Sequence, residues 1–170
     1  TVKLEKKGMG TKTCISCGKA RNTNKFSQNF KLKNGQPGFR NVCRDCDSLR
    51  KNKFISSTPY TYLTKVHTQS KSKRSKDMEW SITAEDLHDL WDEQGGRCAL
   101  SGVFMTYGKD GNGSKEFNAS IDRIDSSKPV YTRTNVQLVT YRVNIMKHTL
   151  TEDLLLWWCR NLIAKHDKID

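Results

Sequence analysis

Three polar side chains that can bind a divalent cation lie close together in the sequence between residues 120 and 147. Asp122 belongs to the run SIDRID, Asn135 begins the run NVQLV, and Asn144 lies in the run RVNIMK. Carboxylate and amide oxygens are ligands that Mg²⁺ and Mn²⁺ take from proteins. If Asp122 stands on one strand, Asn135 opens the next and Asn144 follows on a helix, the segment forms a small site for Mg²⁺ or Mn²⁺.

These residue types suit the hydrolysis of a phosphodiester, which requires negative charge on the phosphate and on the departing oxygen to be neutralised. Asp122 would supply an anionic metal ligand and Asn144 a carbonyl oxygen. Asn135 would hold the loop between the strands through side-chain to backbone hydrogen bonds. Arg123 offers a planar guanidinium for the phosphate. Because neighbouring residues of a regular strand face opposite ways, Asp122 and Arg123 reach one site only where the strand ends or twists.

The elements that must position these residues are predicted from the spacing of the apolar residues. Residues 117–124 and 136–139 have the composition of two paired strands, and the pattern becomes helical from about Thr140. A loop rich in Gly and Asn is predicted over 109–115. The sequence therefore indicates an α+β fold in which a strand pair is followed by a helix.

Two further helices begin at threonines that can cap them. Thr83, with Asp86 three residues later, forms a capping-box pattern, and Gly95 and Gly96 end that helix. Thr151 precedes two acidic residues that suit a helix start. The last helix is expected to pack on the core through its apolar residues, Leu154, Leu155, Trp157, Trp158, Leu162 and Ile163.

Four cysteines form two CxxC pairs, Cys14 with Cys17 and Cys43 with Cys46. Each pair places two thiolates on one tight turn, and two such turns can close a tetrahedral Zn²⁺ site. The segment between the pairs has too few apolar residues for a core, so metal binding would supply folding energy. A redox CxxC would need a βαβ pattern beside it, which the sequence lacks. The pairs predict a zinc-ribbon-like module with a structural Zn²⁺.

Positive charge is concentrated in the first half of the chain. The net charge is +12, with 30 Lys and Arg against 18 Asp and Glu. Residues 1–80 have a net charge of +14 and residues 81–170 a net charge of −2. A basic region of this kind favours a phosphate polyanion as partner, with simple solubility as the alternative reading.

The charge pattern and the motifs divide the chain into three parts. Residues 1–50 would form the four-cysteine module, residues 51–80 a basic linker that contacts DNA, and residues 81–170 the domain with the metal site. The expected DNA-contacting residues are Arg40, Arg44, Arg50, Lys51, Lys53, Lys73, Arg74 and Lys147. No apolar run approaches the roughly 20 residues that span a bilayer, so we expect a soluble intracellular protein with no membrane partner.

The stretch SIDRID…NVQLV…RVNIMK resembles the HNH, or ββα-metal, endonucleases, in the branch found in phage, homing and restriction enzymes. The upstream run QGGRCALSG is similar to that branch as well, and the four-cysteine module resembles a zinc finger that precedes some HNH cores. The resemblance implies a ββα-metal core with helices packed around it and metal-dependent cleavage of double-stranded DNA, in the cytoplasm of a bacterial or phage-infected host. By position, Asp122 and Asn144 match the metal ligands, Asn135 the middle Asn, and Lys147 the final Lys.

The sequence departs from the family at one position that bears on catalysis. Most HNH members have a His after the metal-binding Asp as general base, and here that residue is Arg123, which stays protonated. Tyr107 and His148 are the candidate bases; His148 lies one helical turn after Asn144.

Two other functions remain open at this stage, an inactive zinc-finger DNA-binding protein and an RNA-directed nuclease. A homodimer is expected if both DNA strands are cut, since one site handles one phosphate.

Overall fold

The computed structural model describes residues 10–32, 35, 37–73, 77–108 and 114–167. The chain divides into two compact units, Thr1–Phe54 and Ile55–Asp170. Both combine short strands with helices, so the fold class is α+β, and the described residues contain five α-helices and small two-stranded sheets. No helix among the described residues is long and apolar enough to cross a membrane.

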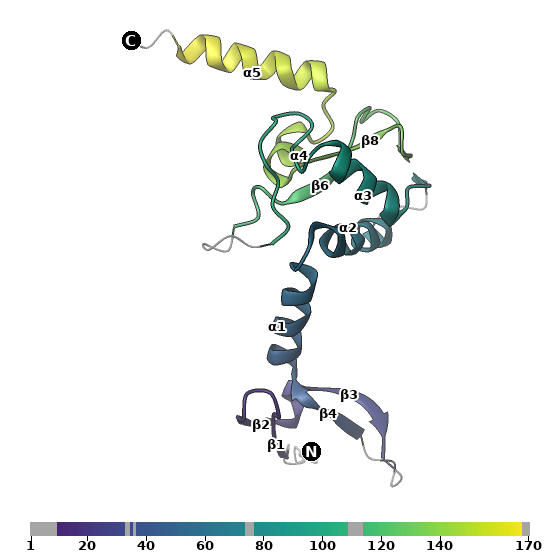
Figure 1. Cartoon of the computed structure of the whole chain (residues 1–170), viewed down its shortest axis with the longest axis vertical. Helices are drawn as coiled ribbons and strands as arrows, with labels where there is room; N and C mark the ends of the chain where they lie inside the picture. The colour runs from purple at the N-terminus through teal and green to yellow at the C-terminus, as the bar shows by residue number, and fades with distance from the viewer. Residues whose placement is uncertain (1–9, 33–34, 36, 74–76, 109–113, 168–170) are drawn as a thin grey trace, which may run out of the picture. The chain divides into compact units, whose positions relative to one another are not determined.

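The first unit consists of two hairpins and a helix (Figure 1). Its elements are β1 (Thr11–Thr13), β2 (Ala20–Asn22), the 3-10 helix η1 (Thr23–Lys25), β3 (Phe26–Lys31), β4 (Pro37–Cys43) and α1 (Arg44–Ile55). The strands pair antiparallel, β1 with β2 and β3 with β4. Its buried apolar cluster is small and centres on Cys14, Phe26 and Cys43. A core of this size gives little hydrophobic stabilisation, and two of its three buried residues are cysteines.

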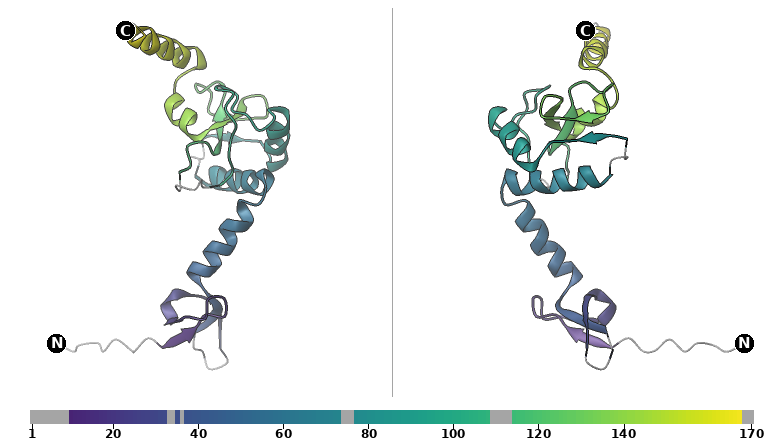
Figure 2. Two further views of the ribbon diagram at one scale, coloured as in Figure 1. Left: turned by 60° about the vertical axis from the view of Figure 1, so that its left-hand side comes forward. Right: turned by 90° about the vertical axis from the view of Figure 1, so that its right-hand side faces the viewer.

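The second unit surrounds one antiparallel strand pair with helices (Figures 1 and 2). Its elements are α2 (Pro59–Lys73), β5 (Glu79–Trp80), α3 (Ala84–Glu93), β6 (Ala119–Arg123), β7 (Val130–Tyr131), β8 (Val136–Thr140), α4 (Tyr141–Lys147) and α5 (Glu152–His166). β6 pairs antiparallel with β8, and β5 pairs in parallel with β7. The β6–β8 pair and the helix α4 that follows it are the strand, strand, helix order expected from the sequence.

The core of the second unit lies on and around the β6–β8 pair. Ile121 on β6 and Leu138 on β8 face each other in register and are buried together with Leu87 and Leu90 of α3. Gln94, which ends α3, accepts a hydrogen bond from Leu138 N at 2.9 Å and donates one to Leu138 O at 2.8 Å. These bonds satisfy the backbone of β8 on its outer edge and fix α3 against it.

Local capping sets where three helices begin. The Thr83 side chain accepts from Asp86 N, and the Asp86 carboxylate accepts from Thr83 N, which confirms the expected capping box at α3. Thr151 Oγ1 caps α5 as expected, and Thr140 caps α4 by accepting from Val143 N. Each cap satisfies a backbone donor that the first helical turn leaves open.

The segment 51–80 differs from the expected linker. It contains the end of α1 and all of α2 and β5, and its fully buried Leu63 belongs to the core of the second unit. The neighbouring Tyr62 donates to Ala119 O at 3.2 Å, and Val66 packs on the same core. These apolar residues recur at helical spacing, so α2 packs one side on the core.

The last helix also differs from the expectation. Only Leu155 of α5 is buried, whereas Leu154, Leu156, Trp157, Trp158, Leu162 and Ile163 are between 41% and 59% exposed. The expected packing of these residues on the core is therefore wrong. The apolar core cluster of the second unit includes no residue of α5, and no element among the described residues covers the exposed side chains. Of the loop expected over 109–115, residues 109–113 lie outside the described residues.

Candidate functional site

Asp122 lies at the fourth position of β6 and is only 4% exposed. Its Oδ2 accepts a hydrogen bond from Lys147 Nζ at 2.8 Å and one from Gln137 Nε2 at 3.0 Å. Gln137 stands directly opposite Asp122 on β8, so the strand register places this donor. The described residues form no hydrogen bond to the other carboxylate oxygen, Oδ1. The carboxylate is thus held by one oxygen, and the second is available for a ligand.

Lys147 is completely buried at the end of α4. Besides Asp122, its ammonium group donates to Arg123 O, to Ile124 O at 3.3 Å and to Ser126 Oγ at 3.2 Å. The expectation that Lys147 contacts DNA is corrected here, because a buried and fully bonded ammonium cannot reach a phosphate. Its charge instead compensates the buried charge of Asp122.

Asn144 lies one turn before Lys147 on α4 and faces β6. Its Nδ2 donates to Ser120 Oγ at 2.7 Å and to Ile121 O at 3.0 Å. A backbone carbonyl can only accept, so the amide nitrogen must be the atom that faces the strand. The Oδ1 of Asn144 then points away from these two acceptors, and no hydrogen bond to it is made by the residues that the structure describes.

One pocket brings these groups together. It has a volume of about 380 Å³, and its lining includes Asp122, Arg123, Tyr131, Tyr141, Asn144 and His148. β6 ends at Arg123 and the chain bends into a loop there, which is how two consecutive residues come to line the same space. The pocket therefore contains a carboxylate, an amide oxygen, a guanidinium, an imidazole and two phenols.

Arg123 is held in the pocket by two neighbours. Its Nη1 donates to Lys128 O at 2.7 Å, and its Cζ lies 5.5 Å from the centroid of the Tyr131 ring. Tyr131 is buried and stacks on Trp80 with 4.8 Å between ring centroids. A cation–π contact of this kind restrains a guanidinium while leaving most of its N–H donors available to an anion.

Asn135 forms the side-chain to backbone bonds that were expected of it. Its Oδ1 accepts from Asp125 N at 2.9 Å, and its Nδ2 donates to Val130 O at 3.0 Å. Inside this loop, hydrogen bonds from Ser127 and then Lys128 lower the pKa of Asp125 to about 2. Asn135 thus closes the loop that follows Arg123, and it does so from outside the lining of the pocket.

The two candidate bases are placed differently. His148 lines the pocket, where its Nδ1 lies 3.3 Å from Thr149 Oγ1. It ends α4 with φ 47° and ψ −107°, a conformation that favours glycine and costs about 1–3 kcal/mol for other residues. Tyr107 does not line the pocket and instead meets Trp91 edge-on, with 6.1 Å between ring centroids. The geometry favours His148 over Tyr107.

Two phenols of the pocket were missed by the sequence reasoning. Tyr131 and Tyr141 line it, yet neither belongs to the motif residues. Tyr141 directly follows the β8 strand, and Tyr131 precedes Asn135 by four residues. Their nearness in sequence to Asn135 and Asn144 is the signal that could have identified them.

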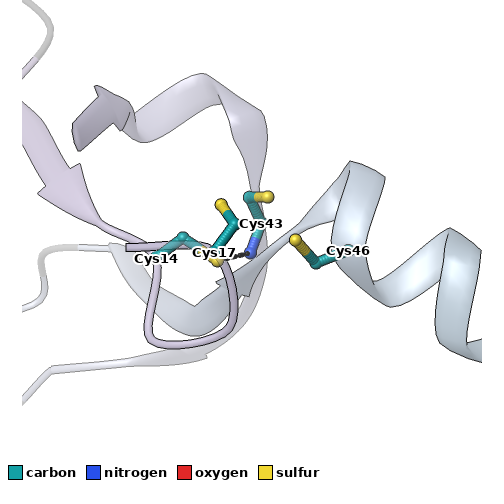
Figure 3. A group of neighbouring side chains, drawn as sticks. All are labelled: Cys14, Cys17, Cys43 and Cys46. Carbon is teal, nitrogen blue, oxygen red and sulfur yellow. Dashed lines mark hydrogen bonds between the residues drawn. The ribbon is translucent and has the colours of Figure 1, made fainter. Parts of the chain in front are cut away.

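The four paired cysteines form a second candidate site in the first unit (Figure 3). Their sulfur atoms all lie within 4.8 Å of one another. Four sulfurs about 2.3 Å from a central ion would be roughly 3.8 Å apart, so the cluster fits a tetrahedral metal centre after a small contraction. Cys14 and Cys43 are buried, which protects the cluster from solvent.

Different local structures present the two cysteine pairs. Cys14 and Cys17 lie on the turn after β1, which Gly18 closes at φ 68°. Cys43 ends β4, and Cys46 lies in the first turn of α1, so the module contains a helix that the sequence reasoning did not include. Cys43 N donates to Cys14 Sγ at 3.3 Å, and this bond is the main cause that lowers the pKa of Cys14 to about 6, with further hydrogen bonds from Cys17 and Ser16. A lowered thiol pKa favours the thiolate that binds a metal.

The basic residues expected to contact DNA fall into two groups. Arg44, Lys53 and Lys73 are exposed, and none of them has an ion-pair partner among the described residues. Arg50 and Lys51 each lie 2.8 Å from the carboxylate of the buried Asp47, with Arg40 4.0 Å from it. Lys51 first, and then Arg50, lower the pKa of Asp47. Three cations around one carboxylate still leave a positive surface. Arg74 lies outside the described residues.

Comparison with known proteins adds little. No family model and no curated protein matches the chain. One similar solved structure is the ββα-Me type II restriction endonuclease Hpy99I, with 16% sequence identity and a TM-score of 0.26. The match covers 99% of this chain and 72% of that one. At this TM-score the likeness carries no weight for fold or function.

Replacing Lys147 with Met is expected to lower the free energy of unfolding by about 3–5 kcal/mol, because Asp122 would stay buried without its cation. The measurement is urea unfolding followed by far-UV circular dichroism. The double variant Lys147→Met with Asp122→Asn should recover much of the loss. Lys128→Met, which removes an exposed ion pair with Asp125, should cost less than about 1 kcal/mol. An unchanged urea midpoint for Lys147→Met would show that the ion pair is not structural.

Proposed function

We propose that the protein is a metal-dependent endonuclease of the HNH, ββα-metal type that hydrolyses phosphodiester bonds of double-stranded DNA. One observation carries the proposal: the unbonded oxygens of Asp122 and Asn144 belong to residues that line the same pocket as Arg123 and His148. A carboxylate and an amide oxygen next to a guanidinium and an imidazole supply a metal site, a phosphate clamp and a base.

Asp122 and Asn144 would hold the metal through their Oδ1 atoms. The donor set is all oxygen, which suits Mg²⁺ or Mn²⁺. The bound ion would supply charge neutralisation at the phosphate and the departing oxygen. Lys147 and Gln137 bind the opposite oxygen of Asp122 and so fix the direction of the carboxylate, while Ser120 and Ile121 fix the amide of Asn144.

Arg123 would bind a non-bridging oxygen of the scissile phosphate with the N–H groups that are not bonded to Lys128. His148 would take a proton from the attacking water, the role that Arg123 cannot perform because its guanidinium stays protonated. Asn135 would act through the loop that it closes, by keeping the end of β6 in the conformation that turns Arg123 to the pocket.

The first unit would bind DNA and depend on zinc. Four thiolates at tetrahedral spacing suit a structural Zn²⁺, with Cys14, Cys17, Cys43 and Cys46 as ligands. The exposed cations of α1, among them Arg44 and Lys53, would contact phosphates. Cleavage of both strands needs two pockets, which a homodimer would provide.

Arg123 in the place of the usual base favours one alternative, a DNA-binding protein that does not cleave. This alternative expects a gel shift with duplex DNA and no metal-dependent product. An RNA-directed nuclease would instead prefer structured RNA to duplex DNA at equal salt concentration.

The first test of the proposal is cleavage of supercoiled plasmid and of phage and bacterial genomic DNA with Mg²⁺ or Mn²⁺. Asp122→Asn is expected to lower the rate by about three orders of magnitude, because loss of an anionic ligand removes several kcal/mol of transition-state stabilisation. Asparagine is used rather than alanine because it keeps a hydrogen-bond acceptor beside Lys147. Since Lys147 loses its buried anion, far-UV circular dichroism must show that the variant is folded under the assay conditions. Asp89→Asn, on the exposed surface of α3, should cut at the wild-type rate. DNA binding without cleavage by the wild type on every substrate would contradict the proposal.

Replacing His148 with Gly separates catalysis from stability. The rate should fall by about 10²–10⁴-fold with the loss of the base. Stability should be retained or rise, because relief of about 1–3 kcal/mol of strain outweighs roughly 0.5–1 kcal/mol of glycine entropy. Cleavage kinetics and thermal unfolding measure the two effects. His148→Ala should lose the same activity without the gain in stability, and full activity in both variants would exclude His148 as the base.

Zinc binding is tested by metal analysis and by ¹H–¹⁵N NMR spectra of the full chain. We expect one Zn²⁺ per chain, and Cys43→Ser should lose the ion together with the dispersed signals of residues 10–54, because metal binding supplies the folding energy of the module. Signals of the second unit should persist. Cys159→Ser on α5 is the matched control and should keep the ion. A Cys43→Ser variant with full zinc content would show that the cluster is not the site.

A further inference from the structure

The helix α5 carries an apolar stripe that the described part of the chain leaves mostly exposed. Leu154, Leu155, Trp158, Leu162 and Ile163 follow one another at i, i+1, i+4, i+8 and i+9, which spreads them over about half of the helix circumference, with Leu162 near the middle. We call these five residues the α5 stripe. Leu155 is buried, whereas Trp158 is 49%, Leu162 58% and Ile163 59% exposed. Most of this apolar face is therefore exposed among the described residues.

The exposed area is large for a helix of a folded monomer. A half-exposed Trp leaves on the order of 100 Å² of surface in water. Together with Leu154, Leu162 and Ile163, which are 43%, 58% and 59% exposed, the stripe offers roughly 400 Å², within the range of the largest apolar patches on monomers. Two such faces pressed together approach the size of the smaller specific interfaces.

The charges of α5 favour a second copy of the same helix as the partner. Glu152 and Asp153 lie in its first turn, and Lys165 and His166 in its last turn. Two copies that pack antiparallel bring the acidic end of each next to the basic end of the other and oppose their helix dipoles. A parallel arrangement would place like charges together. Antiparallel packing of one patch on itself is also the two-fold symmetry that most homodimers use.

We propose that two copies of the chain associate through the α5 stripe in antiparallel orientation. The interface would bury Trp158, Leu162 and Ile163 of both copies. A contact of this size is expected to give a Kd in about the micromolar range. The association does not rest on the nuclease proposal, because no residue of the stripe lines the pocket.

The dimer would nevertheless reach the pocket through one relay of hydrogen bonds. Glu152, the first residue of α5, accepts from Gln137 Nε2 at 2.6 Å, and the same nitrogen donates to Asp122 Oδ2 at 3.0 Å. Fixing α5 against a partner would therefore fix Glu152 and hold Gln137 on the carboxylate. In this arrangement Glu152 is a positioning residue, and each dimer presents two pockets.

Sedimentation velocity of the full chain over a range of concentrations tests the interface. The wild type is expected to change from monomer to dimer, and Leu162→Glu to remain monomeric. Ala164→Glu adds the same charge two residues later, on the opposite side of the exposed helix, and should dimerise like the wild type. Because both positions are exposed, circular dichroism should show an unchanged fold. A monomeric wild type at about 0.1 mM, well above the expected Kd, or a dimer that survives Leu162→Glu, would overturn the proposal.

Two further variants test the orientation and separate the two proposals. Lys165→Glu should weaken the dimer at least several-fold, since it places an acid beside the first-turn acids of the other copy. In a parallel pair the same change only exchanges one like-charge contact for another, so an unchanged dimer would refute the antiparallel orientation. Asp122→Asn should dimerise normally even where cleavage is lost. Failure of cleavage and failure of the interface can therefore be told apart.

Discussion

The buried ion pair between Lys147 and Asp122 is the constraint on which the rest of the second unit depends. Removing two charges from water is costly unless the other hydrogen-bonding atoms of the pair find partners or face a solvent-filled space. Lys147 meets this requirement with Arg123 O, Ile124 O and Ser126 Oγ. These acceptors come from the end of β6 and the loop after it, so α4, the strand pair and the loop must assemble together. The same bonds orient the carboxylate that faces the pocket.

The two units reach stability by different physical means. The second unit buries a continuous apolar cluster around β6 and β8, supported by α2 and α3. The first unit has only a small apolar cluster. Its four cysteine sulfurs lie close together next to that cluster, where a larger domain would have aliphatic and aromatic side chains. A metal ion bound by all four cysteines would link the two hairpins and α1. We therefore expect this unit to fold when the metal binds and to unfold when the metal is removed.

The candidate pocket shows which residues of a site can be predicted from local sequence patterns and which cannot. Asp122, Asn135 and Asn144 were identified from their order on two strands and a helix, and the structure forms those elements around them. Tyr131 and Tyr141 were not predicted, because a local sequence pattern does not distinguish a tyrosine that lines a pocket from one on the surface. Tyr107 was a candidate base, but its ring meets Trp91 edge-on and does not line the pocket. Which phenols face a pocket is decided by contacts between segments distant in sequence.

The sequence alone determined what depends on neighbouring residues: the capped starts of α3 and α5, the β6–β8 pair and the pairing of the cysteines, since caps, periodicity and short spacings act within one element. The tertiary structure decided what depends on distant partners. Lys147 has the charge of a DNA contact and became the counter-ion of Asp122, and α2 looked like a basic linker but buries Leu63. The apolar residues of α5 predicted burial, yet most of them are exposed. Burial requires another element that packs on the helix, and the spacing of apolar residues within α5 gives no information about that element.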